Sequence, residues 1–144
     1  MNQIQPHHFY AFIMILIIII FAAAGILVRV LFSWSVFKTA KRIPQEHHLF
    51  PAWFCWLMII PIIGIVFDWM MLPFGVPWSA KKYFEDNEQA KQAANVLFGI
   101  GLAYAICIST VFIPILNFIT GIGTIVLWII YWVKIVNFRK EFLA

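Results

Sequence analysis

One acidic residue, Asp68, lies within a long apolar block of the sequence, residues 52–78. A carboxylate surrounded by apolar chain is costly to keep charged, so such a residue is commonly paired with a cation or used to bind and move one. Two interpretations follow for Asp68: a proton or cation site, and a structural carboxylate that either forms an ion pair with Arg29 or Lys134 or lies near a membrane interface. We favour the ion pair, and we predict a charge site made of Asp68, Arg29 and Lys134.

Histidine and cysteine are the other residue types here that could bind a metal or haem. The histidines form two adjacent pairs, His7-His8 and His47-His48, and both pairs lie outside the apolar runs with no further ligand at a regular spacing. Cys55 and Cys107 each lie inside an apolar run, which is typical of buried free thiols. We therefore predict no metal site and no cofactor.

Motifs for catalysis are absent from the sequence. Gly99-Ile100-Gly101 lacks the third glycine and the preceding strand that a dinucleotide site needs. Ser109 and Thr110 have no histidine or acidic residue near them in the sequence, as an activated nucleophile would require. We expect a protein that is not an enzyme and has no catalytic residues.

Small residues recur at helical spacing in the C-terminal half of the chain. Gly101, Ala105 and Ser109 are four residues apart, and Gly121 lies near the start of the last apolar run. Small side chains at this spacing let two helices approach closely. This packing face has two interpretations, closure of a hairpin within the chain and docking of another subunit, and residues 22–25 offer a second such surface.

The composition indicates what kind of solvent surrounds these residues. The chain is 64% hydrophobic and 11% charged, whereas a soluble domain is roughly half apolar and about a quarter charged. Its net charge of +4 comes from Lys and Arg placed beside apolar runs, which is typical of membrane orientation and contact with anionic lipid. We expect an all-α integral membrane helical bundle whose partners include lipids and exclude nucleic acid.

The apolar runs predict a single membrane domain over residues 1–144. The first run has 24 residues, about 36 Å of helix, which is enough to cross a hydrocarbon core of about 30 Å. Its leader, residues 1–8, lacks Lys and Arg, so we expect an uncleaved first span. The first predicted elements are a span at 9–32 and a spanning or re-entrant block at 53–72. A polar helix at 79–95, capped near Ser79, is predicted to continue into a span at 96–113. A turn at Pro114-Ile115-Leu116-Asn117 then leads to the last span at 118–136.

The block at 52–78 allows two topologies, because Pro61, Gly64 and Pro73 interrupt it. Four transmembrane helices are the first choice, although loops would then alternate sides and the basic residues would be divided between them. Three spans plus a re-entrant helical hairpin at 52–78 would place all ten Lys and Arg on one side. The second topology is kept as the alternative.

Three short phrases carry a likeness to known sequences: Pro61-Ile62-Ile63-Gly64, Pro114-Ile115-Leu116-Asn117, and Trp132 to Lys134. They resemble small bacterial inner-membrane proteins of unknown function, which often have such a turn between spans and a Trp before Lys at the membrane exit. The resemblance implies a multi-span fold and no activity.

From these features we predict a non-enzymatic membrane subunit, a structural or accessory component of a larger inner-membrane complex or of a homo-oligomer. The alternative is a small oligomeric channel or transporter component that uses Asp68. The expected location is the bacterial inner membrane, with most Lys and Arg on the cytoplasmic side. The expected partners are membrane lipids and either other membrane subunits or copies of the same chain.

Overall fold

A computed structural model describes residues 6–110 and 113–144, and the regular structure within these residues is entirely helical. Four of its helices are long and apolar enough to cross a membrane: Phe9–Ala40, Ile63–Tyr83, Glu88–Ser109 and Ile119–Phe142. The elements in chain order are α1 (Pro6–Ala40), η1 (Gln45–His47), α2 (Phe54–Leu57), α3 (Ile63–Trp69), the π-helical η2 (Met70–Gly75), α4 (Val76–Tyr83), α5 (Glu88–Ser109) and α6 (Pro114–Phe142).

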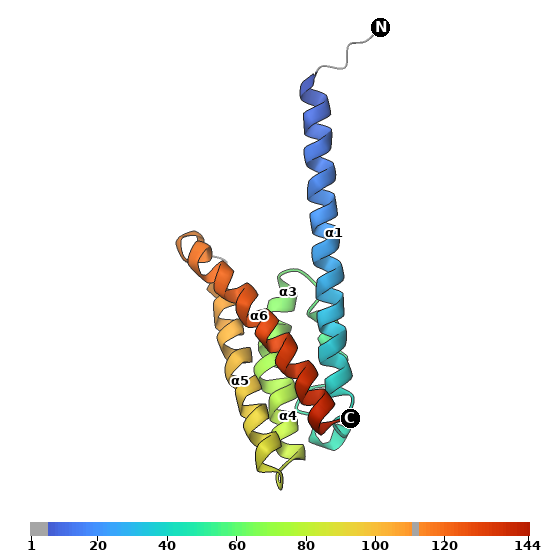
Figure 1. The fold of residues 1–144 in the computed structure, drawn as a ribbon, viewed down its shortest axis with the longest axis vertical. Helices are drawn as coiled ribbons and strands as arrows, with labels where there is room; N and C mark the ends of the chain where they lie inside the picture. The colour runs from blue at the N-terminus through green and yellow to red at the C-terminus, as the bar shows by residue number, and fades with distance from the viewer. Residues whose placement is uncertain (1–5, 111–112) are drawn as a thin grey trace.

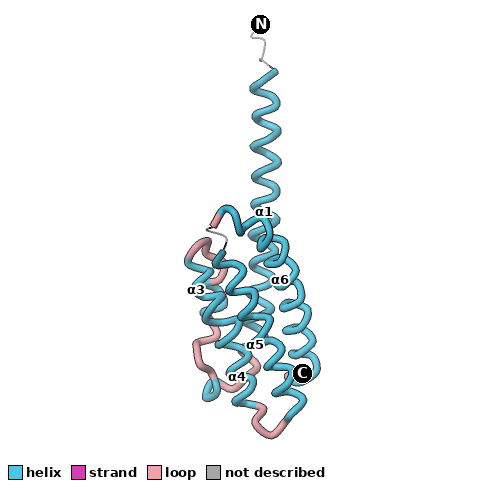
Figure 2. The backbone as a smooth tube through the Cα atoms, turned by 90° about the vertical axis from the view of Figure 1, so that its left-hand side faces the viewer, coloured by secondary structure: helices cyan, strands magenta, loops and turns pink. Residues whose placement is uncertain are grey.

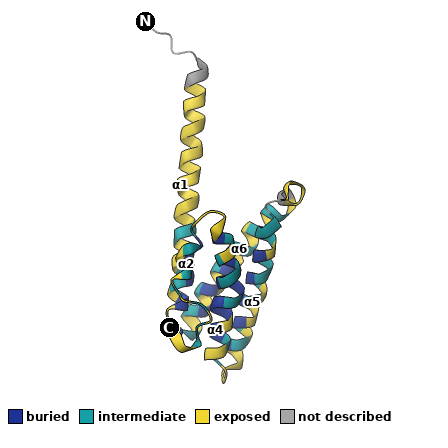
Figure 3. Ribbon diagram, turned by 180° about the vertical axis from the view of Figure 1, so that it is seen from behind, coloured by how far each residue is buried: buried dark blue, intermediate teal, exposed yellow. Residues whose placement is uncertain are grey.

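Helix α1 is far longer than the bundle against which it packs. Its 35 residues make about 52 Å of helix, and the N-terminal half stands clear of the other elements (Figure 1). Side chains from Phe9 to Leu27 are exposed, whereas Phe32 and Val36 in the C-terminal half are buried (Figure 3). Only the C-terminal part of α1 therefore contributes to the core.

After α1 the chain turns back and then reverses a second time at residues 58–62. The short α2 runs back along α1, and the following turn places Ile62 at φ 68°, an uncommon value for a β-branched residue. Glycine is needed two residues later, because a Cβ on Gly64 would lie 2.5 Å from the Met58 carbonyl oxygen. The continuous helical run α3–η2–α4 then extends in the same direction as α1 (Figure 1).

This double reversal brings the ends of three helices together at one end of the molecule (Figure 2). Arg42 Nη1 donates to the Leu143 carbonyl at 2.8 Å, and the Leu49 amide donates to Ser79 Oγ at 3.2 Å. We call this end, formed by the C-terminal ends of α1, α4 and α6 with the loops at 41–53 and 84–87, the charged end. Every Lys and Arg except Arg29 and Lys134 belongs to the helix ends and loops nearest to it.

The backbone thus differs from the alternating four-helix arrangement that was our first choice. α1, α3–η2–α4 and α6 run toward the charged end, and among the long helices of the described residues only α5 runs away from it (Figures 1 and 2). The path of residues 54–83 is that of a helical hairpin with its tip at 58–62, as in the re-entrant alternative for 52–78. Pro61 breaks the helix at this tip because proline has no amide hydrogen to donate.

The predicted continuous helix from 79 through 95 to 113 is wrong. Residues 79–83 end α4, a turn at 84–87 reverses the chain, and α5 begins at Glu88. The cap is Asn87, whose side chain accepts a hydrogen bond from the Ala90 amide at 3.1 Å. Ser79, the expected cap, is buried within α4 and donates to the Gly75 carbonyl at 2.5 Å.

The predicted turn at 114–117 is also displaced. These four residues form the first turn of α6, with Pro114 at the first helical position and Ile113 before it. The connection therefore lies between Ser109 and Pro114, and its residues 111–112 lie outside the described part of the chain.

The core lies between α1, the 63–83 helix, α5 and α6 at the half of the bundle nearer the charged end (Figure 3). A π-helical turn with Pro73 inside it leaves the Leu72 carbonyl open to a side-chain donor, and Pro77, five residues later, has no amide hydrogen to offer it. Tyr131 donates its buried hydroxyl to that carbonyl at 2.8 Å. α6 is thereby attached to the helical hairpin of residues 54–83.

Candidate functional site

Four groups from four different segments meet at one buried charge cluster. Arg29 on α1 donates through Nη2 to Asp68 Oδ2 at 2.5 Å, through Nη1 to the Tyr104 hydroxyl at 2.9 Å, and through Nε to the Met58 carbonyl at 3.1 Å. Asp68 lies on α3, Tyr104 on α5 and Met58 at the tip of the hairpin. One guanidinium therefore connects α1 to the rest of the fold.

Local structure makes each of these groups available to Arg29. The Met58 carbonyl lies in the turn between α2 and α3, where the backbone leaves it free of a helical partner. Gly64 lets α3 pass directly against this turn, which places Asp68, one helical turn later, on the side facing α1. The fork of five N–H donors on arginine suits three acceptors that approach from different directions.

Burial and charge indicate that the cluster is mainly a structural connection. The Asp68 side chain is 0% exposed and that of Arg29 is 23% exposed, and their charges offset each other. A buried carboxylate paired with an arginine at hydrogen-bonding distance avoids most of the cost of an isolated charge. The second carboxylate oxygen of Asp68, Oδ1, is buried and makes no hydrogen bond to the described residues.

The structure brings together two of the three residues predicted for the charge site. Arg29 and Asp68 form the ion pair, which is one of the two pairings that we expected for Asp68. Lys134 is exposed on α6 and forms no ion pair within the described residues. Tyr104 and the Met58 carbonyl were not predicted, because neither a tyrosine in an apolar run nor a backbone carbonyl has a distinctive sequence signal.

Two mainly apolar hollows lie on either side of Arg29. One, of about 390 Å³, lies between α1 and the hairpin tip and is lined by Ala22, Ile26, Pro61 and Ile65 among others. The second, of about 460 Å³, lies between α1 and α6. We call the second hollow the α1–α6 wedge, and its lining residues are Phe21, Ala24, Gly25, Val28, Arg29, Tyr104, Thr124, Ile125 and Trp128.

Members of the predicted helix-packing face have different surroundings. Gly101 and Ala105 are buried against the π-helical turn, where a Cβ on Gly101 would lie 2.7 Å from the Leu72 carbonyl oxygen. Ser109 accepts a hydrogen bond from Trp69 Nε1 at 2.8 Å. Gly121 is half-buried on α6. Three of these four residues thus lie on α5, on the side that meets the hairpin helix.

Three other glycines face open space. A Cβ on Gly25, Gly99 or Gly123 would meet no atom within 4 Å. Gly64 and Gly101, in contrast, lie against the backbone of another segment, and Gly75 lies against Met71 of its own helical turn. Packing therefore accounts for one group of glycines, and no neighbour among the described residues accounts for the other.

The histidines and cysteines are not gathered into a ligand set. His48 Nε2 lies 2.9 Å from both the Ala40 and Ile43 carbonyls at the end of α1, so this nitrogen carries the hydrogen and donates. Cys55 and Cys107 are free thiols. Within residues 6–110 and 113–144, no three His, Cys, Asp or Glu residues are close enough to hold a metal ion. The side chains of His7 and His8 lie outside the described residues.

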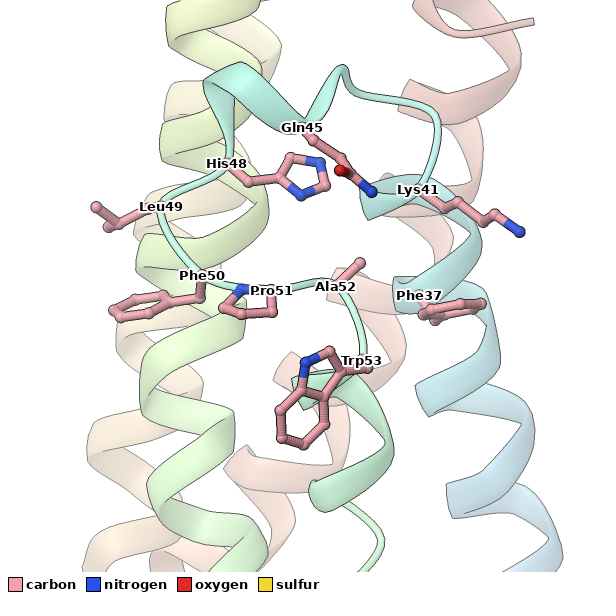
Figure 4. Close-up of a pocket in the computed structure, with 9 residues that line it drawn as sticks. All are labelled: Phe37, Lys41, Gln45, His48, Leu49, Phe50, Pro51, Ala52 and Trp53. Carbon is pink, nitrogen blue, oxygen red and sulfur yellow. The ribbon is translucent and has the colours of Figure 1, made fainter.

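A further hollow, of about 500 Å³, lies at the charged end, away from the charge cluster (Figure 4). The loop at 48–53 forms one wall, and Phe37 and Lys41 from the end of α1 form another. The Lys41 side chain points away from His48 (Figure 4). With one cation that points outward and no acidic group in its lining, this hollow has no recognisable catalytic arrangement.

Comparison with known proteins identifies no relative: no family model, curated protein or solved structure matches the chain. The function must therefore be argued from the geometry alone.

Proposed function

We propose that this protein is a non-enzymatic integral membrane subunit that associates with another membrane protein or with copies of itself through the α1–α6 wedge. The observation that carries the proposal is the open glycine Gly25, which lines this wedge and has no atom within 4 Å of a Cβ built on it. Glycine lets a neighbouring helix approach a backbone closely, which is how helices associate in lipid.

The arrangement of α1 supports the same proposal. Residues 9–28 of α1 are mainly apolar, and none of them is buried by the rest of the described chain. α1 and α6 diverge from the charge cluster, so the space between them widens away from the charged end (Figure 1). An additional apolar helix would fill this space and cover Phe21, Ala24 and Ile125.

Gly25→Leu tests the wedge directly. Because nothing lies within 4 Å of a Cβ at this position, the substitution should leave the fold of the monomer intact while blocking close approach of a second helix. We expect the protein to lose its partner, or to become monomeric, when it is extracted gently in native lipid discs and its mass is measured.

Gly99→Leu is the matched control, because Gly99 is also open but does not line the wedge. It should leave the mass of the complex unchanged. If the wild-type protein is extracted as a lone, monodisperse monomer, the subunit proposal fails. If Gly25→Leu and Gly99→Leu both retain the partner, association occurs elsewhere and the wedge is excluded.

The proposal includes an orientation and a location. We place the protein in the bacterial inner membrane with the charged end in the cytoplasm, because basic residues are retained on that side. The re-entrant arrangement of residues 54–83 supports this orientation, since it lets α1, α4 and α6 all end on one side. The N-terminus and the α5–α6 connection would then face outward.

A small oligomeric channel or transporter component that uses Asp68 is the second candidate. In its favour are the buried Asp68 Oδ1 without a hydrogen-bond partner and the partial exposure of Arg29 to two hollows. Against it, Asp68 is wholly buried and paired, and the hollows are lined mainly by apolar side chains. Unchanged ion and proton flux in vesicles containing folded Asp68→Asn would exclude this role.

A further inference from the structure

A second cleft between α1 and α6 lies closer to the charged end than the wedge does. Its volume is about 290 Å³, and its lining residues are Leu31, Trp34, Ser35, Lys38, Trp132, Val136 and Arg139. It is separate from the charge cluster, because neither Arg29 nor Asp68 contributes to its lining.

Each wall of this cleft has two apolar side chains followed by a cation. Along α1 the order is Leu31, Trp34, Lys38, and along α6 it is Trp132, Val136, Arg139. The first and last residues of each series are seven positions apart, or about 10 Å along the helix. Both helices run toward the charged end, so the apolar groups lie at the inner end of the cleft and both cations lie at its outer end.

Several contacts hold these side chains in place. Arg139 Nη1 donates to the Ser35 carbonyl across the cleft at 3.4 Å, which keeps the guanidinium against α1. Lys38 Nζ lies 5.6 Å from the centre of the Trp34 ring, within the range of a cation–π contact. The two cations are therefore presented side by side from different helices.

Neither cation has an acidic partner in the described part of the chain. The ion pairs found there join Arg29 to Asp68, His47 to Glu46 and Lys91 to Glu88. Two positive groups that share one cleft repel each other, and a bound anion removes this cost. Lysine offers three donors and arginine five, which leaves donors available to oxygens of a phosphate.

We propose that this cleft binds one anionic phospholipid, with the headgroup phosphate between Lys38 and Arg139 and an acyl chain along Leu31 and Val136. The inner, apolar end of the cleft favours a lipid over a free phosphate ion, because a free ion would leave that end empty. Trp34 lies about one helical turn inside Lys38, as tryptophans do at the boundary between headgroups and acyl chains, and Trp132 lies deeper in the cleft. The inference rests on the membrane placement in the proposed function and is independent of the wedge.

The test is native mass spectrometry of the full chain released from micelles that contain equal amounts of phosphatidylglycerol and phosphatidylcholine. Wild-type protein should retain one phosphatidylglycerol. The variant Lys38→Gln/Arg139→Gln should lose this preference by roughly 25-fold, since each basic residue near an anionic headgroup contributes roughly fivefold in affinity. The conservative variant Lys38→Arg/Arg139→Lys should retain the bound lipid, because both cations are kept.

The matched control is Lys82→Gln/Lys140→Gln, which removes the same charge from two exposed positions near the charged end. It should retain the phosphatidylglycerol. If the control loses as much phosphatidylglycerol as the cleft variant, surface charge alone attracts the lipid. If both variants retain the lipid equally, the cleft is not its binding site. Either result overturns the proposal. Displacement of the lipid by millimolar inorganic phosphate would overturn the choice of a lipid as ligand.

Flotation of each variant with membranes separates failure of this site from failure of the membrane placement. A cleft variant that floats with membranes and lacks the lipid supports the site. Wild-type protein that does not float would contradict the proposed function itself.

Discussion

Removing both members of the Arg29–Asp68 pair should destabilise the fold less than removing either one alone. The variants are Arg29→Met, which keeps a long unbranched side chain, and Asp68→Leu, which keeps the branched shape of the aspartate. Each single variant leaves a buried charge or a set of buried acceptors without its partner, whereas the double variant removes the charges together.

The size of each effect follows from the contacts. With charge centres about 4 Å apart and an effective dielectric constant of about 20, the attraction is about 4 kcal/mol. Arg29→Met removes the hydrogen-bond donor to the fully buried Asp68 carboxylate, the Tyr104 hydroxyl and the Met58 carbonyl. We therefore expect a loss of about 4–5 kcal/mol in the free energy of unfolding. Asp68→Leu leaves Arg29 with its two other acceptors and partial exposure, so its cost should be nearer 3 kcal/mol.

The double variant should lose about 1–3 kcal/mol, mainly from the hydrogen bonds to Tyr104 and Met58. The coupling energy between the two positions should therefore be about 4–7 kcal/mol. The assay is reversible unfolding in mixed micelles by titration with a denaturing detergent, followed by tryptophan fluorescence. If the two single effects simply add in the double variant, the pair is not the connection that we describe.

Three further substitutions test other contacts by the same unfolding assay. Gly101→Ala should cost roughly 1–3 kcal/mol, because its Cβ would lie 2.7 Å from the Leu72 carbonyl oxygen; a neutral result would mean that α5 does not pack tightly there, and Gly99→Ala is the neutral control. Tyr131→Phe should cost about 1–3 kcal/mol, since it leaves the buried Leu72 carbonyl without its donor; no loss would show that another donor replaces the hydroxyl. Asn87→Ala should cost about 1 kcal/mol by removing the cap of α5, and Asn87→Asp should retain stability; equal effects of the two variants would exclude capping as the cause.

The long helices could be predicted from the sequence because uninterrupted apolar runs have few other stable states. The arrangement of 52–78 could not be decided, since a proline inside an apolar run is compatible with both a kinked helix and a helical hairpin. The deciding contact is the close approach of Gly64 to the Met58 backbone, which depends on three-dimensional packing. The bias of Lys and Arg toward one side was the sequence feature that pointed to the hairpin.

The turn at 84–87 was missed because the residues on both sides of it favour helix. Asp86-Asn87 was available as a sequence signal, since these residue types commonly begin helices by accepting backbone hydrogen bonds. At the charge cluster, Asp68 stood out as a lone acid, and Arg29 and Lys134 were its two candidate partners. Choosing between those partners needed the relative positions of α1, α3 and α6, which no local pattern contains.

The most direct test of the account is the topology of the charged end. Single cysteines at Gln45, Gln89 and Ala144, and at Tyr10 and Ile115 for the opposite end, would be introduced into Cys55→Ser/Cys107→Ser protein and labelled in intact cells with an impermeant thiol reagent. We predict that Gln45, Gln89 and Ala144 positions are protected while Tyr10 and Ile115 positions react. Labelling that places the Gln45 and Gln89 positions on opposite sides of the membrane would contradict the re-entrant arrangement and the orientation that rests on it.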